Sequence, residues 1–215
     1  MDEYQNMLDL VGSDYLRRIM GSAERMDALI QDLLEYSRLS GSELSFSPVA
    51  LHETVESAVQ QCEHEIERAG GEEQVNVNPV FVLAHAATLE NALGNLIANA
   101  LKFSRPGVPP KITIRTTNRN EFVQISVQDN GIGIAPEHHG RIFRVFERLH
   151  GVNKFPGTGI GLAMVKKGVE RMGGRVGLAS QPNEGSLFWI ELPRASVPLQ
   201  MQESVEIMAS GNGRR

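Results

Sequence analysis

A single long amphipathic helix, expected over residues 13 to 39, constrains this chain more than any other feature. Its apolar residues recur at alternating three- and four-residue spacing, the heptad-like pattern of a helix that packs lengthwise against a partner. The stripe consists of Leu16, Ile19, Met20, Ala23, Met26, Leu29, Ile30, Leu33 and Leu34. Ser13 or Asp14 is the expected N-cap. The stripe can dock on the chain's own core, but we favour a bundle with another helix or another copy of the chain, because the segment before it is too short to cover it.

The composition is that of an ordinary globular protein. Of the 215 residues, 41% are hydrophobic and 22% are charged, which is enough apolar material for a packed core. The formal net charge of -5 argues against a nucleic-acid partner. The one cysteine, Cys62, excludes a disulfide within the chain. Because no apolar run reaches the roughly 18–20 residues of a membrane span and the first residues do not resemble a secretory signal, we expect a cytoplasmic protein without direct membrane insertion.

After the first region, residues 1–39, the chain divides into a linker, one α/β unit and a tail. We assign residues 40–46 to the linker, 47–194 to the unit and 195–215 to a disordered tail. Helical periodicity covers 51–68, 87–103 and 159–172, and alternating apolar residues predict strands within 75–83, 112–114, 123–127, 176–179 and 187–192. This order predicts a two-layer α/β sandwich in which helices cover one face of a mixed sheet.

The helix over residues 87–103 carries an unusual polar face. Asn95, Asn99 and Lys102 are spaced by four and then three residues, so they lie on one side of the helix. Asparagine is a middling helix former, and two at this spacing call for a reason. One interpretation is a solvated polar face. The other is that the amide oxygens and the ammonium face a hydrated cation and phosphates, since Mg²⁺ prefers hard oxygen ligands and tolerates a partial protein shell.

A second feature follows the strand predicted at 123–127. Asp129 is followed by the sequence NGIGI, residues 130–134. An acceptor at the end of a strand, followed by two glycines, allows the close approach of a flat ligand. Asp129 can then accept a hydrogen bond from an exocyclic amine. The alternative is a β-turn in which Asn-Gly has no role beyond the turn itself.

A third feature is the glycine-rich sequence PGTGIGL at residues 156–162, where a helix is expected to begin. Glycines free backbone N–H groups to face an anion, and a helix N-terminus favours negative charge. Neither the dinucleotide-binding pattern of glycines nor the phosphate-loop pattern with its lysine is present.

The segment between these two loops is basic in an otherwise acidic chain. Its basic residues are Arg141, Arg144, Arg148 and Lys154, against one acid, Glu147. It is either an ordinary basic surface with two core aromatics, Phe143 and Phe146, or a mobile lid over phosphates that is hinged by Gly151 and Gly157.

Taken together, the order and spacing of these motifs resemble the ATP-binding catalytic domain of sensor histidine kinases, within the wider superfamily of gyrase, chaperone, histidine kinase and mismatch-repair ATPases. NLIANALKFS resembles the family's N box, DNGIGI its G1 box, RIFRVF its F box and GTGIGL its G2 box. The closing EGSLFWIELP is similar to the last strand, and PGTGIGLAMVKK is most similar to phytochrome-type kinases. The helix at 13–39 resembles the second helix of the family's dimerisation and phosphotransfer hairpin.

The resemblance assigns roles to individual residues. Asn99 would be the Mg²⁺ ligand, Asn95 would face the triphosphate, and Lys102 would contact phosphate. Asp129 would accept the adenine amine, supported by Ser186. The other residues that the resemblance assigns to nucleotide binding are Phe103, Gly131, Gly133, Ile134, Phe143, Gly157, Thr158, Gly159, Gly161 and Leu162. The implied cofactors are therefore ATP and Mg²⁺.

Two positions refine the implied chemistry. Hydrolytic members of the superfamily have Glu where this chain has Asn95, and an amide cannot activate water as a general base, which favours transfer to a histidine over hydrolysis. The family's acceptor histidine lies on the first hairpin helix, and nothing similar precedes residue 15.

We therefore expect a histidine kinase catalytic module with a truncated hairpin. Its acceptor histidine would be upstream or on a separate protein, its partners would be a response regulator receiver domain and a second copy of the chain, and the chain alone would bind ATP without autophosphorylation. The alternatives are an ATP hydrolase of the same superfamily and a non-catalytic nucleotide-binding interaction module.

Overall fold

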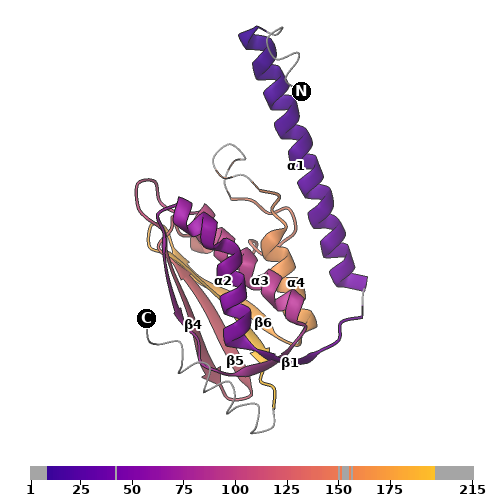
Figure 1. Cartoon of the computed structure of the whole chain (residues 1–215), viewed down its shortest axis with the longest axis vertical. Coiled ribbons are helices and arrows are strands. Elements are labelled where there is room, and N and C mark those ends of the chain that lie inside the picture. Colours follow the sequence, from indigo (N-terminus) through magenta and orange to yellow (C-terminus); the bar gives the residue numbers. More distant parts are fainter. Residues whose placement is uncertain (1–8, 42, 150, 152–154, 156, 197–215) are drawn as a thin grey trace.

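A computed structural model describes residues 9–41, 43–149, 151, 155 and 157–196 (Figure 1). Within these ranges the chain forms two layers, a mixed sheet and the helices that cover one of its faces, with one long helix extending beyond them. This confirms the predicted α/β sandwich. Most of the tail predicted from residue 195, together with Lys154 and Pro156 of the loop motifs, lies outside the described residues.

The long helix α1 spans Leu10–Gly41 and is longer than predicted at both ends. The expected N-cap at Ser13 or Asp14 is wrong, because both residues lie inside the helix. Asp9 performs this role, since its carboxylate accepts a hydrogen bond from the Gly12 N–H at 2.7 Å. The apolar stripe is not covered by the chain's own core: Ile19 is 66% exposed and Met26 is 59% exposed.

The main sheet contains five strands in the order β2–β4–β5–β7–β6. Their bounds are Glu72–Asn76, Lys111–Arg119, Phe122–Asp129, Gly185–Pro193 and Arg175–Gln181. β2 pairs with β4 in parallel and all other neighbours are antiparallel. A separate antiparallel pair, β1 (Ser47–Ala50) and β3 (Phe81–Ala84), is connected to the end of β7 through a bridge between Val82 and Arg194.

Three helices pack on the inner face of this sheet: α2 (Leu51–Arg68), α3 (Ala86–Lys102) and α4 (Gly161–Arg171). Their apolar faces and the inward residues of β4, β5 and β7 form one core. The fully buried large side chains include Leu51, Leu89, Leu93, Leu96, Ile97, Ile114, Ile125 and Ile190. His85 caps α3, because its Nδ1 accepts from the Thr88 N–H at 3.3 Å.

The helix boundaries of α4 show what the glycines do. The helix begins at Gly161, two residues later than predicted, because Gly159 has a φ of 80° and cannot belong to it. Gly173, with a φ of 75°, ends the helix as predicted. The core therefore anchors the C-terminal end of α3, the end of β5 and the N-terminus of α4 around the same point.

Candidate functional site

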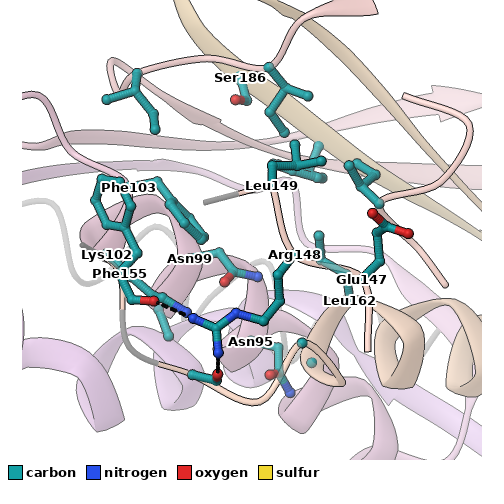
Figure 2. A pocket seen from close by; sticks show the side chains of 18 of the residues that line it. Asn95, Asn99, Lys102, Phe103, Glu147, Arg148, Leu149, Phe155, Leu162 and Ser186 are labelled. Atoms are coloured by element: carbon teal, nitrogen blue, oxygen red, sulfur yellow. Dashed lines mark hydrogen bonds between the residues drawn. The ribbon is translucent and has the colours of Figure 1, made fainter. Parts of the chain in front are cut away.

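One pocket lies where these three ends meet (Figure 2). Most of the residues that the sequence motifs single out line it. They are Asn95, Asn99, Lys102, Phe103, Asp129, Gly133, Ile134, Gly157, Thr158, Gly159, Gly161, Leu162 and Ser186. In Figure 2 Ser186 lies at one end and Asn95 at the other, with Arg148 extending across the opening. Motifs that are far apart in the sequence therefore form a single elongated site.

At the sheet end of the pocket the central group is Asp129, the last residue of β5, which is 9% exposed. One carboxylate oxygen, Oδ1, accepts hydrogen bonds from the backbone N–H groups of Gly131 at 2.7 Å and Ser186 at 3.1 Å. Burial raises the pKa of Asp129 above its ordinary value, although these hydrogen bonds act in the opposite direction. The Ser186 side chain also hydrogen-bonds to this carboxylate, which leaves part of its acceptor capacity for a ligand.

Two glycines make this end of the pocket possible. A Cβ at Gly131 would lie 2.4 Å from the Phe103 carbonyl oxygen, and a Cβ at Gly133 would lie 1.9 Å from that of Gln181. Gly133 also has a φ of 66°, a conformation that L side chains rarely adopt. Gly131 itself does not line the pocket as described; it packs behind Asp129 and donates to it. The loop after β5 is thus pressed against the hairpin of β6 and β7.

At the other end, the polar face of α3 provides two amides and an ammonium. The Asn95 side-chain nitrogen donates to the Asn91 carbonyl at 3.0 Å, which leaves its oxygen directed toward Gly161. A Cβ at Gly161 would lie 2.6 Å from that oxygen, so glycine is required where α4 approaches α3. The Lys102 Nζ lies 4.8 Å from the Phe103 ring centroid. Burial, and to a smaller extent the charge of Arg148, lower the pKa of Lys102.

The N-terminus of α4 closes this end. Its first backbone N–H groups have no side-chain cap, except that the Ile160 N–H donates to the Thr158 hydroxyl at 3.3 Å. Such free N–H groups and the helix dipole favour an anion. Arg148 donates to the backbone oxygens of Phe155, at 2.9 Å, and Gly157. The end of the pocket opposite Asp129 therefore offers two cations, Lys102 and Arg148, and the N–H donors of a helix N-terminus.

Sequence reasoning placed some residues differently from the structure. Phe143 of the aromatic pair does not line the pocket as described; its ring packs edge-on against Phe188, with centroids 6.4 Å apart. The aromatic partner inside the pocket is Phe155, whose ring centroid lies 5.0 Å from that of Phe103. Arg148 was recognised only as part of a basic segment, and Asp32 of α1 was not singled out at all.

Asp32 reaches the pocket because the C-terminal part of α1 docks on the α/β unit (Figure 1). The Asp32 carboxylate accepts a hydrogen bond from the Thr158 hydroxyl at 2.5 Å. One turn later, Glu35 accepts from the Asn91 side chain at 3.1 Å. Arg171 of α4 donates to the Leu39 carbonyl at 2.5 Å. Polar contacts along one face of α1 thus hold it beside α3 and α4.

Two further features are absent from the part of the chain that the structure describes. The described residues contain no cluster of three or more His, Cys, Asp or Glu side chains that could hold a metal ion. A cation at the pocket would therefore have fewer than three such ligands from the described residues, and amide oxygens such as that of Asn99, a bound group or water would supply the others. Among the helices the structure describes, none is long and apolar enough to cross a membrane.

Comparison with known proteins places these features in a family. The family model described as histidine kinase-, DNA gyrase B- and HSP90-like ATPase matches residues 84–196. The phytochrome-like protein Cph1 of Synechocystis is 35% identical over 190 residues, 88% of this chain and 25% of that protein. The signal transduction histidine-protein kinase BarA of Escherichia coli is 34% identical over 193 residues, 83% of this chain and 20% of that protein.

A solved structure gives the same result for the fold. The crystal structure of full-length ShkA in complex with AMPPNP superposes with a TM-score of 0.71 at 29% identity, covering 88% of this chain and 40% of that chain. This chain therefore spans about a quarter of the length of Cph1 and a fifth of the length of BarA.

Proposed function

Because this chain belongs to the histidine kinase-, DNA gyrase B- and HSP90-like ATPase family, and its relatives include sensor histidine kinases, we propose that it is the ATP- and Mg²⁺-dependent catalytic module of a histidine kinase in a two-component signalling system. The observation that carries the proposal is the pocket's polarity. A buried carboxylate, Asp129, stands at one end, and the polar face of α3 and the uncapped start of α4 stand at the other. This separation matches the two ends of a nucleoside triphosphate.

We assign the following roles to the residues of the pocket. Asp129 accepts a hydrogen bond from the adenine amine, Ser186 supports that carboxylate, and Phe103 lies beside the base. Lys102 and the N–H groups at the start of α4 hold phosphate oxygens. When bound, Mg²⁺ neutralises charge on the phosphates, and the Asn99 amide oxygen is the protein ligand that would hold it. The partial protein shell fits this ion, because Mg²⁺ retains ligands from water and phosphate.

Asn95 separates transfer from hydrolysis. It lies on α3 against the start of α4, where it can orient the triphosphate by hydrogen bonding. Its amide cannot take a proton from water as a general base. We therefore favour transfer of the γ-phosphoryl group to a histidine ring nitrogen, whose lone pair needs little activation.

The acceptor histidine would come from a hairpin, either in an upstream segment or in a separate protein. No histidine is among the described residues that line the pocket. The exposed apolar stripe of α1 is suited to pack in a helical bundle with a second copy of the chain. The phosphoryl group would pass from the histidine to a response regulator receiver domain. The use of ATP and the single reduced cysteine, Cys62, favour a cytoplasmic setting.

The test uses the whole chain, γ-labelled ATP, Mg²⁺ and a purified hairpin fragment carrying an acceptor histidine from a related kinase. We expect label in acid-labile, base-stable phosphate on the fragment and none on the chain alone. Asn99→Ala should lose this transfer. The control variant Gln128→Ala should retain it, because the Gln128 side chain is exposed on β5.

The other outcomes separate the alternatives. Release of free phosphate without labelled fragment would indicate an ATP hydrolase. Binding of ATP with neither product, for several different hairpins, would indicate a non-catalytic nucleotide-binding interaction module. Acid-labile phosphate on the chain alone would contradict the expectation that its acceptor lies elsewhere.

A further inference from the structure

The contact between α1 and the pocket puts a carboxylate where the proposed function puts phosphate. Asp32 lines the pocket and accepts from the Thr158 hydroxyl. That hydroxyl in turn accepts from the Ile160 N–H at the start of α4. Asp32 is thus the acceptor for a donor at the same helix N-terminus that favours an anion. A phosphate oxygen and the Asp32 carboxylate would be two negative groups competing for one set of donors.

The charges around this point make the competition selective. Among the described residues that line the pocket, the cations are Lys102 and Arg148, and Glu147 is paired with Arg141 at 3.1 Å. Asp32 comes from a different element, α1, and is half-buried. Its negative charge opposes each added phosphate but has little effect on an uncharged base bound beside Asp129 at the other end, because electrostatic repulsion falls with distance.

The docking of α1 is built from a few displaceable contacts. Asp32, Glu35 and Leu39 are spaced by three and four residues and so share one helical face. A small cavity remains beneath that face, lined by Glu35, Leu39, Thr88, Asn91, Ala92, Asn95, Met164 and Val165. One of these hydrogen bonds is exposed and two are partly buried. Because a single hydrogen bond contributes only a modest net free energy, the binding of a charged ligand can outweigh them.

We propose that Asp32 sets the phosphate-number preference of the pocket: with α1 docked, it disfavours the triphosphate, and triphosphate binding in turn weakens the docking of α1. The second half follows from the first, because coupling between two binding equilibria is reciprocal. Most of the apolar stripe of α1, including Ile19, Met26 and Ile30, stays exposed while α1 is docked. Docking therefore does not compete with a helical bundle. This inference rests on the proposed function, since it assumes that the pocket binds a nucleotide.

The first experiment compares ATP, ADP and adenosine binding by calorimetry in the whole chain, in Asp32→Asn and in Asp27→Asn. The Asp32→Asn side chain can still accept from Thr158 but carries no charge. Asp27 is an exposed acid on the same helix, which makes it a matched control for net charge. We expect Asp32→Asn to bind ATP about five-fold more tightly, ADP less so, and adenosine as the original chain does, with Asp27→Asn unchanged.

The second experiment follows docking itself by amide hydrogen exchange in residues 28–41. We expect ATP to speed exchange in this part of α1, and adenosine to leave it unchanged. Equal or weaker ATP binding by Asp32→Asn would overturn the inference, as would a gain that is the same for adenosine. If the original chain binds none of the three ligands, the proposed function fails; if it binds them and Asp32→Asn changes nothing, only this inference fails.

Discussion

The two ends of the pocket are built in different ways. The end around Asp129 belongs to one unit. Strand pairing joins β5 to the β6–β7 hairpin, and backbone N–H groups of the loop after β5 and of β7 donate to the Asp129 carboxylate. The end around Lys102 is assembled from α1, α3 and the loop before α4, which meet mostly through side chains. The sheet therefore preforms the Asp129 end, whereas the Lys102 end depends on how separate elements are placed.

The two ends also differ in how they tolerate burial of charge. Asp129 is desolvated, but two backbone N–H groups compensate part of the cost. Lys102 is desolvated and lies near a second cation, Arg148. An anion bound there would relieve both effects, whereas a neutral base at the other end would leave Lys102 unchanged. Variants at the Asp129 end should therefore weaken the binding of ATP and adenosine alike, whereas variants at the Lys102 end should weaken the binding of ATP alone.

The largest effect is expected at the sheet end. In Asp129→Asn the amide oxygen can still accept from Gly131 and Ser186, but the amide nitrogen presents a donor to the adenine amine. We expect the affinities for adenosine and for ATP to fall alike, by about 100-fold, because the variant loses a charge-assisted hydrogen bond and leaves a donor unpaired. Calorimetric titration of both ligands measures this, with Gln128→Ala as the control.

The same variant has an informative effect on stability. Because burial raises the pKa of Asp129 in the folded protein above its ordinary 3.8, the ionised carboxylate costs folding free energy at neutral pH. The neutral amide avoids this cost, so the melting temperature at neutral pH should hold or rise. The difference should disappear as the pH falls through the raised pKa. A large loss of stability in Asp129→Asn, or a loss of ATP binding without loss of adenosine binding, would contradict the assignment.

The next effect concerns the phosphate end. Asn99→Ala removes the amide oxygen that we assign to Mg²⁺. We expect the affinity for ATP in the presence of Mg²⁺ to fall roughly ten- to thirty-fold, a free energy typical of one hydrogen bond to a charged group, while adenosine binding is unchanged. Titrations with and without Mg²⁺ measure the effect. Asn118→Ala, an exposed asparagine at the β4–β5 hairpin, is the control. Equal losses for ATP and adenosine would show that Asn99 supports the pocket as a whole.

A pH titration sharpens the comparison further. Because burial and Arg148 lower the pKa of Lys102 below its ordinary 10.5, the ammonium that we assign to phosphate binding is lost as the pH rises through that lowered value. We expect ATP affinity to fall about five-fold at alkaline pH, with adenosine affinity flat. Lys102→Arg should shift the decline to higher pH, and Lys111→Arg, at an exposed lysine paired with Glu72, should not.

The stability of the free protein should respond with the opposite sign. Over the range between the lowered pKa of Lys102 and 10.5, the unfolded chain binds more protons than the folded one, so the free energy of unfolding rises with pH. If the free energy of unfolding rises with pH while the ATP affinity falls, both changes are assigned to the deprotonation of Lys102. A parallel fall of both would mean that the loss of affinity is only a loss of folded protein.

The sequence was sufficient for the parts of the site that depend on local patterns. The spacing of Asn95, Asn99 and Lys102 predicted one polar face, and the glycines after Asp129 predicted a close approach, because both are short-range consequences of helix and turn geometry. The mixed sheet and the C-terminal end of α4 at Gly173 followed from the same kind of evidence.

The missing parts depend on contacts between distant segments. Asp32 and Thr158 are 126 residues apart, and nothing local in α1 marks Asp32 among its other charged residues. Phe143 and Phe155 are both aromatics of the same stretch, and only the packing of Phe143 against Phe188 decides which of them reaches the pocket. The predicted N-cap of α1 was wrong because Asp9, Ser13 and Asp14 all have side chains that can cap a helix. Which of them does so depends on where the helix begins.

The smallest effect tests whether the phosphate end depends on motion within α3. Gly94 lies in the middle of that helix, and a Cβ there would meet nothing within 4 Å. Gly94→Ala should therefore stabilise the protein by about 0.5–1 kcal/mol, because alanine loses less backbone entropy in a helix. Gly94 is not among the described residues that line the pocket, so ATP and adenosine affinities should both stay unchanged. A selective change in ATP affinity, measured beside the gain in unfolding free energy, would mean that the phosphate end relies on flexibility in α3 and not only on the placement of its side chains.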